Sequence, residues 1–182
     1  MITRILVGLA LGPAFLAALF FLPPVPLAVV VAVIAAMASF ELLRASKVAH
    51  HNGMYVYTAL AAAAIPLGHS LGYGSWTARA VSILLMAALF LPALGRYGTG
   101  SEVRFEHIIV CLFGGVGIPL FLSALVQLKR LDNGQFYVLL PVICAFTTDI
   151  GAYFVGVFFG KHRGITQVSP NKSLEGFVGG VL

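Results

Sequence analysis

Residues 136–160, FYVLLPVICAFTTDIGAYFVGVFFG, are the clearest indication of the fold class of this chain. A helix needs about 20 predominantly apolar residues to cross a bilayer, and this stretch supplies them. Its only side chain of ordinary acidity or basicity is Asp149. A charge at the centre of a spanning helix costs about 3 kcal/mol even on the lenient insertion scale, so such acids usually face a cavity, pair with a cation or bind an ion. The alternative is an acid that caps a broken helix or is neutralised by a neighbour.

Five more apolar stretches precede this one along the chain. The chain is 60% hydrophobic and 9% charged, whereas about a quarter of the residues of a soluble domain are charged. We therefore predict an all-α fold, a polytopic transmembrane helical bundle of six spans plus the start of a seventh near Leu174. The predicted spans are Ile5–Leu22, Val25–Leu43, Tyr55–Leu71, Ala78–Leu94, Phe105–Leu128 and Phe136–Phe159.

The cations between the spans predict the orientation of the bundle. With the N-terminus inside, the inner segments hold eight lysines and arginines, and the outer ones only Arg79, Lys129 and Arg130. This excess predicts a multi-pass protein of the cell (inner) membrane, with the N-terminus and the loop 160–173 in the cytoplasm. The net charge of +5 then follows from the positive-inside bias of a protein in the lipid bilayer and from one basic loop. No nucleic-acid partner is needed to explain it. A cleaved signal peptide is disfavoured, because further spans of the same kind follow the first at once.

The segment after the sixth span, GKHRGITQVSPNKSLEGFVGG at residues 160–180, is rich in groups that bind phosphate. Clustered cations, hydroxyls and exposed backbone N–H groups suit a phosphate-rich ligand. We expect Ser173 to cap a helix that begins at Leu174, whose N-terminus would favour an anion. The alternative is a cytoplasmic loop that touches anionic lipid headgroups. We favour phosphate binding for Lys172, and both interpretations stay open for His162 and Arg163.

Helical spacing places Asp149, Tyr153, Gly156 and Gly160 on one face. We expect this face to point inward, where its small residues permit close approach of another helix or of a ligand. Gly156 and Gly160 also form a GxxxG pattern, which on its own more often indicates helix packing. Asp149 lies about 15 Å along a helix from Phe159, so a polar substrate from the cytoplasm would need a water-filled cavity or a helix that starts deeper.

The order of these residues resembles the phosphatidate cytidylyltransferase (CDP-diacylglycerol synthase) family. TDIGAYFVGVFFGKHRG at 148–164 and SPNKSLEGFVGG at 169–180 are similar to the family's D-[ST]-GAY…GxxFGKH block and its SPxKTxEGxxGG block. Ile150 stands where the family has serine or threonine, and Ser173 stands where it has threonine. The resemblance covers residues 114–182, and the first hundred residues match only as apolar spans.

The resemblance implies a reaction in which CTP and phosphatidic acid give CDP-diacylglycerol and pyrophosphate, with Mg²⁺ as cofactor. It further implies that Asp149 is a catalytic residue and metal ligand and that Lys172 is catalytic and binds nucleotide phosphates. Lys161, Ser169 and Ser173 would also bind these phosphates. The implied partners are CTP, phosphatidic acid and the bilayer, with a homodimer left open.

The same resemblance divides the chain by function. Residues 1–104 would form N-terminal membrane helices with four spans, and residues 105–182 the N-terminal part of the catalytic region. The family's further C-terminal signature is not found in this sequence, so we expect a truncated chain that is inactive alone. Three alternatives stay open: a proton- or anion-coupled transporter that uses Asp149, a non-catalytic assembly subunit, and a related lipid-phosphate transferase.

Overall fold

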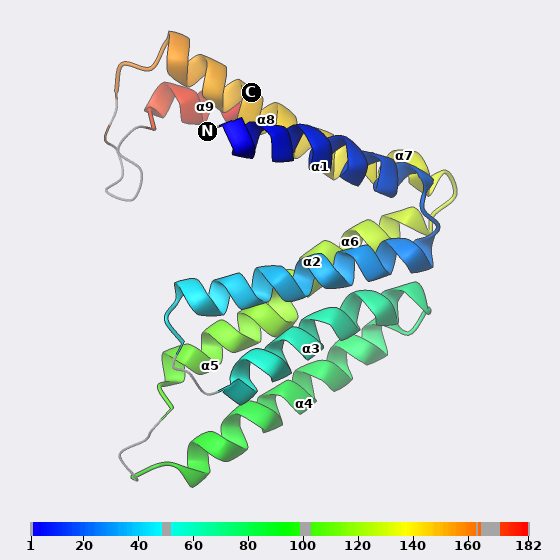
Figure 1. Ribbon diagram of the computed structural model, residues 1–182, viewed down its shortest axis with the longest axis vertical. Coiled ribbons are helices and arrows are strands. Elements are labelled where there is room, and N and C mark those ends of the chain that lie inside the picture. Colours follow the sequence, from blue (N-terminus) through cyan, green and yellow to red (C-terminus); the bar gives the residue numbers. More distant parts are fainter. Residues whose placement is uncertain (1, 49–51, 99–102, 163, 165–171, 182) are drawn as a thin grey trace. The chain divides into compact units, whose positions relative to one another are not determined.

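The computed structural model describes residues 2–48, 52–98, 103–162, 164 and 172–181, with side chains described outside residues 2–11 and 52. The regular elements of this described part are helices (Figure 1). Contacts divide the chain into two compact units, residues 1–135 and 136–182. The predicted division at residue 104 concerns function and stays a prediction.

The first unit is built mainly from long apolar helices. Pro23 and Pro24 lie at its first turn, since α1 ends at Phe21 and Pro24 is the first residue of α2. Proline suits this position, since its fixed φ fits the first helical residue and its missing N–H would have no helical partner. The elements are α1 (Ile2–Phe21), α2 (Pro24–Ala45), α3 (Asn52–Ser70), α4 (Gly74–Gly95), α5 (Phe105–Leu112), the π-helix η1 (Phe113–Gly117) and α6 (Ile118–Lys129).

Helix α3 is central to this unit, because it packs against α2, α4, α5, η1 and α6. Small residues such as Ala61 and Ala62 are buried on it, which lets the neighbouring helices approach closely. Buried side chains from several helices form the core between them. These are Leu43, Val48, Met54, Ala61, Leu85, Leu89, Ile108 and Cys111.

A short π-helix interrupts the predicted span Phe105–Leu128 at the sequence FGGVG. A π-helical turn shifts the regular hydrogen-bonding pattern of the helix. Here Ser39 of α2, which is fully buried, donates through its Oγ to the carbonyl of Gly114 at 2.6 Å. The irregular turn is therefore held by a neighbouring helix.

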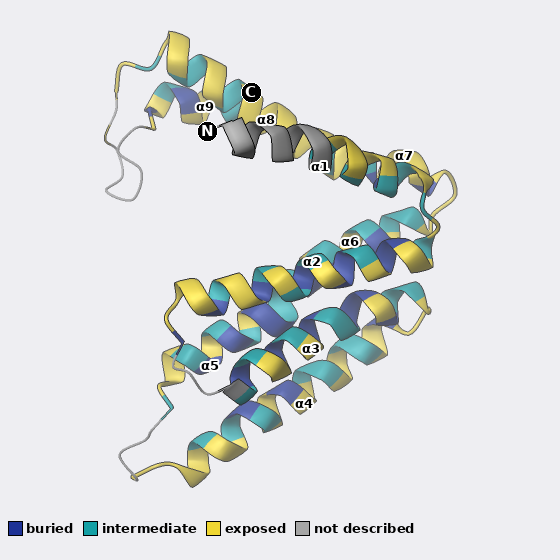
Figure 2. Cartoon of the chain, viewed as in Figure 1, coloured by how far each residue is buried: buried dark blue, intermediate teal, exposed yellow. Residues whose placement is uncertain are grey.

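The second unit is a helical hairpin. The short α7 (Gly134–Tyr137) leads into α8 (Leu139–Phe158), and α9 (Leu174–Val181) packs along α8. The two helices run antiparallel, because Gly180 lies beside Thr148 and Ala152 while Ser173 lies beside Gly156 and Gly160. No residue of α8 is buried, and the helix is accordingly coloured yellow and teal in Figure 2.

Four helical segments of the described chain are long and apolar enough to cross a membrane: Pro24–Ala45, Gly74–Gly95, Phe105–Lys129 and Gly134–Phe158. These coincide with four of the six predicted spans, so the all-α class is confirmed and the count of six is not. Helix α3 does not qualify, and it carries Tyr55, Tyr57, Pro66 and His69 among its alanines. In α1 the apolar stretch with described side chains, Gly12–Phe21, is too short to count.

Candidate functional site

The two motif blocks of the sequence fold together as the α8–α9 hairpin, and glycines set how closely its helices approach. A Cβ atom added to Gly151 would lie 2.4 Å from the carbonyl oxygen of Gly179. One added to Gly176 would lie 2.8 Å from the carbonyl oxygen of Ala152. Neither backbone oxygen can move out of the way without shifting a helix. Glycine is therefore required on both sides of this contact.

The predicted face of α8 is divided by this packing. Gly156 and Gly160 contact α9, since a Cβ on either would lie within 3.3 Å of Ser173 Oγ. Asp149 and Tyr153 are exposed within the described part of the chain. Packing against another helix is thus observed for the glycines. The expected inward orientation of Asp149 stays a prediction.

His162 and Glu175 contact each other at the end of the hairpin where α8 ends and α9 begins. Nδ1 of His162 lies 2.6 Å from Oε1 of Glu175, and the backbone N–H of His162 donates to both carboxylate oxygens at 3.3 and 3.2 Å. The backbone N–H of Leu174 donates in turn to the carbonyl of His162 at 3.0 Å. These contacts, which we call the neck, join the end of the GKH block to the start of α9.

The neck makes Glu175 an unusually acidic carboxyl group. The hydrogen bond from the His162 side chain, supported by backbone N–H groups, lowers the pKa of Glu175 from 4.5 to about 2. Hydrogen bonds to a carboxylate favour its charged form. Glu175 also lies in the first turn of α9, where the helix dipole favours negative charge. The carboxylate is therefore ionised at neutral pH and holds the His162 backbone.

Ser173 caps α9, as the sequence predicted. Its Oγ accepts the N–H of Gly176 at 3.1 Å, and the residue is only 6% exposed. The hydroxyl is thus engaged in building the hairpin. Contact between Ser173 and a nucleotide phosphate, which would use its remaining O–H, stays a prediction.

The structure brings some of the predicted site residues together and keeps one apart. Lys161 and Lys172 are exposed and adjoin the neck, at the same end of the hairpin. Asp149 lies in the middle of α8, beside the residue that contacts Gly180. The helical rise separates Asp149 from Phe158, the last residue of α8, by about 14 Å. Ser169 and Arg163 lie outside the described residues.

Asp149 can contribute only one carboxylate to a metal site. In the described part of the chain, no three His, Cys, Asp or Glu side chains gather closely enough to hold a metal ion. Mg²⁺ commonly binds through one or two carboxylates together with substrate phosphates and water. Among the described residues, Asp149 would therefore supply one carboxylate to a Mg²⁺ ion shared with substrate phosphates, and this role stays a prediction.

Sequence reasoning missed Glu175 as a component of this site. Glu175 follows directly after Leu174, where the predicted helix begins, and the sequence assigns His162 no partner. An acid in the first turn of a helix is a signal for contacts with backbone N–H groups at that end. This signal did not indicate that His162, 13 residues earlier in the chain, would lie within hydrogen-bond distance of Glu175.

Comparisons with known proteins are consistent with the two motif blocks. The phosphatidate cytidylyltransferase of Mycobacterium bovis is 30% identical over an alignment of 191 residues, and the alignment covers 98% of this chain and 61% of that protein. The phosphatidate cytidylyltransferase of Bacillus subtilis is 27% identical over 182 residues, covering 98% of this chain and 66% of that protein. The one from Mycobacterium leprae is 39% identical over 71 residues, covering 39% of this chain and 23% of that protein.

The chain thus spans about 60% of the length of the first of these relatives. No solved structure shows a significant match. The model of the cytidylyltransferase family matches residues 2–182, nearly the whole chain. This chain belongs to the cytidylyltransferase family.

Proposed function

We propose that the protein to which this chain belongs transfers the cytidylyl group from CTP to phosphatidic acid, giving CDP-diacylglycerol and pyrophosphate. The observation that carries the proposal is the neck. It joins the two motif blocks and sets Lys161 and Lys172 at one end of a hairpin in a membrane protein. A water-soluble triphosphate and a bilayer-bound phosphate must meet at such a boundary.

The residues around the neck are assigned to the triphosphate. Lys161 and Lys172 would hold the β- and γ-phosphates as point charges. Ser173 would donate a hydrogen bond from its hydroxyl group to a phosphate oxygen. Ser169 is assigned the same role from its motif position. Because the neck fixes the backbone beside both lysines, their charges are held at one end of the hairpin before the nucleotide arrives. Such prior organisation lowers the ordering cost of binding.

Asp149 is assigned to the deeper part of the same site. It would be one ligand of Mg²⁺, and the ion would offset negative charge on the phosphates of CTP. Asp149 lies about 14 Å from the C-terminal end of α8. The proposal therefore includes a water-filled cavity that reaches it from the cytoplasm.

The chemistry is an in-line displacement at phosphorus. A phosphate oxygen of phosphatidic acid attacks the α-phosphorus of CTP, and the bond between that phosphorus and the oxygen bridging to the β-phosphate breaks. Pyrophosphate leaves with the bonding electron pair. The two lysines would stabilise the charge that builds up on this leaving group.

The membrane arrangement proposed for this reaction has six spans with the N-terminus inside and a seventh that starts at α9. This places the neck in the cytoplasm, where CTP is available. The alternative of a transporter gains no support from the comparisons, since the relatives are described as phosphatidate cytidylyltransferases. A homodimer stays open.

Membranes from cells that express the protein test the proposal with CTP labelled in its α-phosphate. We expect label to enter the lipid fraction only when phosphatidic acid is present. Asp149→Asn should lower the rate about a hundredfold, because a metal ligand contributes several kcal/mol to the transition state. Lys172→Ala should weaken CTP binding, and Lys47→Ala serves as a control, since this exposed lysine lies in the other unit. Full activity in both site variants would refute the assignment.

A further inference from the structure

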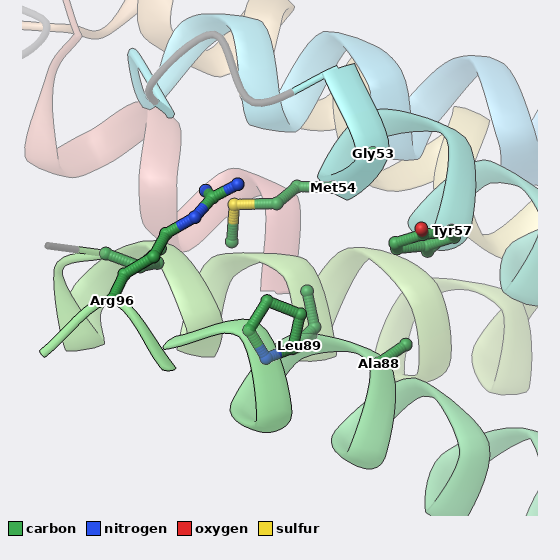
Figure 3. A pocket seen from close by; sticks show the side chains of 8 residues that line it. Gly53, Met54, Tyr57, Ala88, Leu89 and Arg96 are labelled. Atoms are coloured by element: carbon green, nitrogen blue, oxygen red, sulfur yellow. The ribbon is translucent and has the colours of Figure 1, made fainter. Parts of the chain in front are cut away.

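Helix α4 has an inner side that packs within the first unit and an outer side that is apolar and exposed. On the inner side, Leu85 and Leu89 are buried in the core. Figure 3 shows part of this side, where Ala88 and Leu89 of α4 and Tyr57 of α3 line a hollow of about 190 Å³. The outer side carries exposed large apolar side chains, namely Ile83, Leu84, Met86, Leu91 and Leu94. This outer side requires an apolar environment.

Exposed aromatic residues mark both ends of α4. Trp76 lies in its first turn and is 69% exposed, and Tyr97 follows two residues after its end and is 81% exposed. Residues 80–95 between them carry no charged side chain. The helical rise from Trp76 to Tyr97 is about 32 Å, and the hydrocarbon core of a bilayer is about 30 Å thick. Tryptophan and tyrosine are enriched at both boundaries between a membrane and water, so this spacing fits one complete crossing.

Arg79, the one charged residue of α4, extends toward the Trp76 end of the helix. Its Nε donates to the carbonyl of Ser75 at 3.0 Å, and its guanidinium carbon lies 4.4 Å from the centre of the Trp76 ring. Both partners precede Arg79 in the chain, so its side chain points toward the N-terminal end of α4. A long basic side chain near the end of a spanning helix reaches the membrane surface in this way, while its stem lies among acyl chains.

The start of α4 is held firmly against α3. A side chain at Gly68 would collide with Thr77, and one at Gly74 would collide with the ring of His69. These contacts join the last turn of α3 to the first turn of α4 on both sides of the connecting turn. The depth of Trp76 in a bilayer therefore reports the depth of this end of the first unit.

We propose that the outer side of α4 contacts bilayer phospholipids directly, with acyl chains along Ile83 and Leu91 and with Trp76 and Arg79 at the boundary between acyl chains and headgroups. Lipid fits better than another helix, because helices in membranes associate through small residues and this side consists mostly of large ones. The inference uses no residue assigned to the reaction. It therefore does not depend on the proposed transferase activity, nor on which end of the unit faces the cytoplasm.

Fluorescence quenching tests this inference, because Trp76 is the only tryptophan of the chain. The purified chain is reconstituted in phosphatidylcholine vesicles whose acyl chains carry bromine near the headgroup, midway or at the chain end. We expect bromine near the headgroup to quench Trp76 most, at a depth of about 15 Å from the bilayer centre. In a Trp76→Phe background, Tyr97→Trp should give the same profile. Ala87→Trp in that background should be quenched most by bromine at the chain end, because Ala87 lies about 16 Å along the helix from Trp76.

Tyr55→Trp in the Trp76→Phe background is the matched control. Tyr55 lies near the start of α3, at the Tyr97 end of the first unit, but packs against the core and the Phe40 ring. Each brominated lipid should therefore quench it less than Tyr97→Trp. Weak quenching of Trp76 by every brominated lipid would overturn the proposal, because protein would then cover α4. Strongest quenching of Trp76 by chain-end bromine would also overturn it. The wild-type profile keeps the test decisive even if a variant fails to fold.

Discussion

The three cations that the sequence places on the outer side each have a local partner in the structure. Lys129 donates through Nζ to the carbonyls of Leu19 and Phe20 at 2.6 and 2.7 Å, at the end of α1. Arg130 donates to the carbonyl of His69 at 2.6 Å, at the end of α3. Arg79 lies 4.4 Å from the centre of the Trp76 ring. The last carbonyls of a helix have no partner within it, so a cation there stabilises the end. These exceptions to the positive-inside bias therefore have structural roles.

The pair His162–Glu175 predicts how the stability of the hairpin depends on pH. The pKa of Glu175 is about 2 in the folded chain, below its ordinary value of 4.5. A carboxyl group with a lowered folded pKa stabilises the fold fully above its unfolded pKa and loses that contribution as pH falls through the folded value. We expect the neck to weaken between about pH 4.5 and pH 2. The melting temperatures of wild type and Glu175→Gln should therefore differ at pH 6 and converge toward pH 2.

Glu106→Gln provides the comparison for this experiment. Glu106 pairs with Arg104, and both side chains are 69% exposed, so this ion pair is well solvated. Exposed pairs contribute little to stability. The Glu106 variant should match wild type across the whole pH range. A Glu175→Gln variant that also matches wild type at pH 6 would show that the neck does not stabilise the hairpin.

At the scale of elements, small residues decide which helices pack closely. Glycines on both α8 and α9 bring the two backbones together. Alanines on α3 do the same between its neighbours in the first unit. Lipid tails are as apolar as large side chains, so helices in a membrane associate mainly through close packing and hydrogen bonds. The α8–α9 hairpin and the centre of the first unit follow this rule.

Gly151→Ala should loosen the hairpin, because its Cβ would lie 2.4 Å from the Gly179 carbonyl oxygen. Overpacking of this kind typically costs about 1–3 kcal/mol. Hydrogen exchange of peptides from α9 should become faster in this variant. Gly12→Ala is the matched control in α1, since a Cβ there meets nothing within 4 Å. Unchanged protection of α9 in Gly151→Ala would contradict the close contact.

At the scale of the whole molecule, the first unit separates its cations by end. Arg44, Lys47, Arg96 and Arg104 adjoin the ends of α2 and α4 and the start of α5, where Leu43, Val48, Leu89 and Ile108 share one core. Lys129 and Arg130 lie at the opposite end, beside the ends of α1 and α3. That the end with Arg44 and Arg96 faces the cytoplasm stays a prediction from the positive-inside rule.

Cysteine labelling in intact cells measures this orientation. In a chain with Cys111 and Cys144 replaced, we expect a membrane-impermeant maleimide to label Asp132→Cys from outside. Lys47→Cys and Lys161→Cys should react only after the membrane is permeabilised, because both lie in predicted inner loops. Labelling of Lys161→Cys from outside, with Lys47→Cys protected, would show that the number of crossings between residues 47 and 161 differs from the prediction.

The helical membrane class, the Ser173 cap and the family could be predicted from the sequence. These depend on composition and on neighbours within a few residues, where solvation and backbone geometry act locally. The contact between His162 and Glu175 could not be predicted in this way, and neither could the division of the α8 face between packed glycines and an exposed Asp149. Such contacts depend on how helices far apart in the chain approach each other, and the spacing of residues along one helix does not specify that approach.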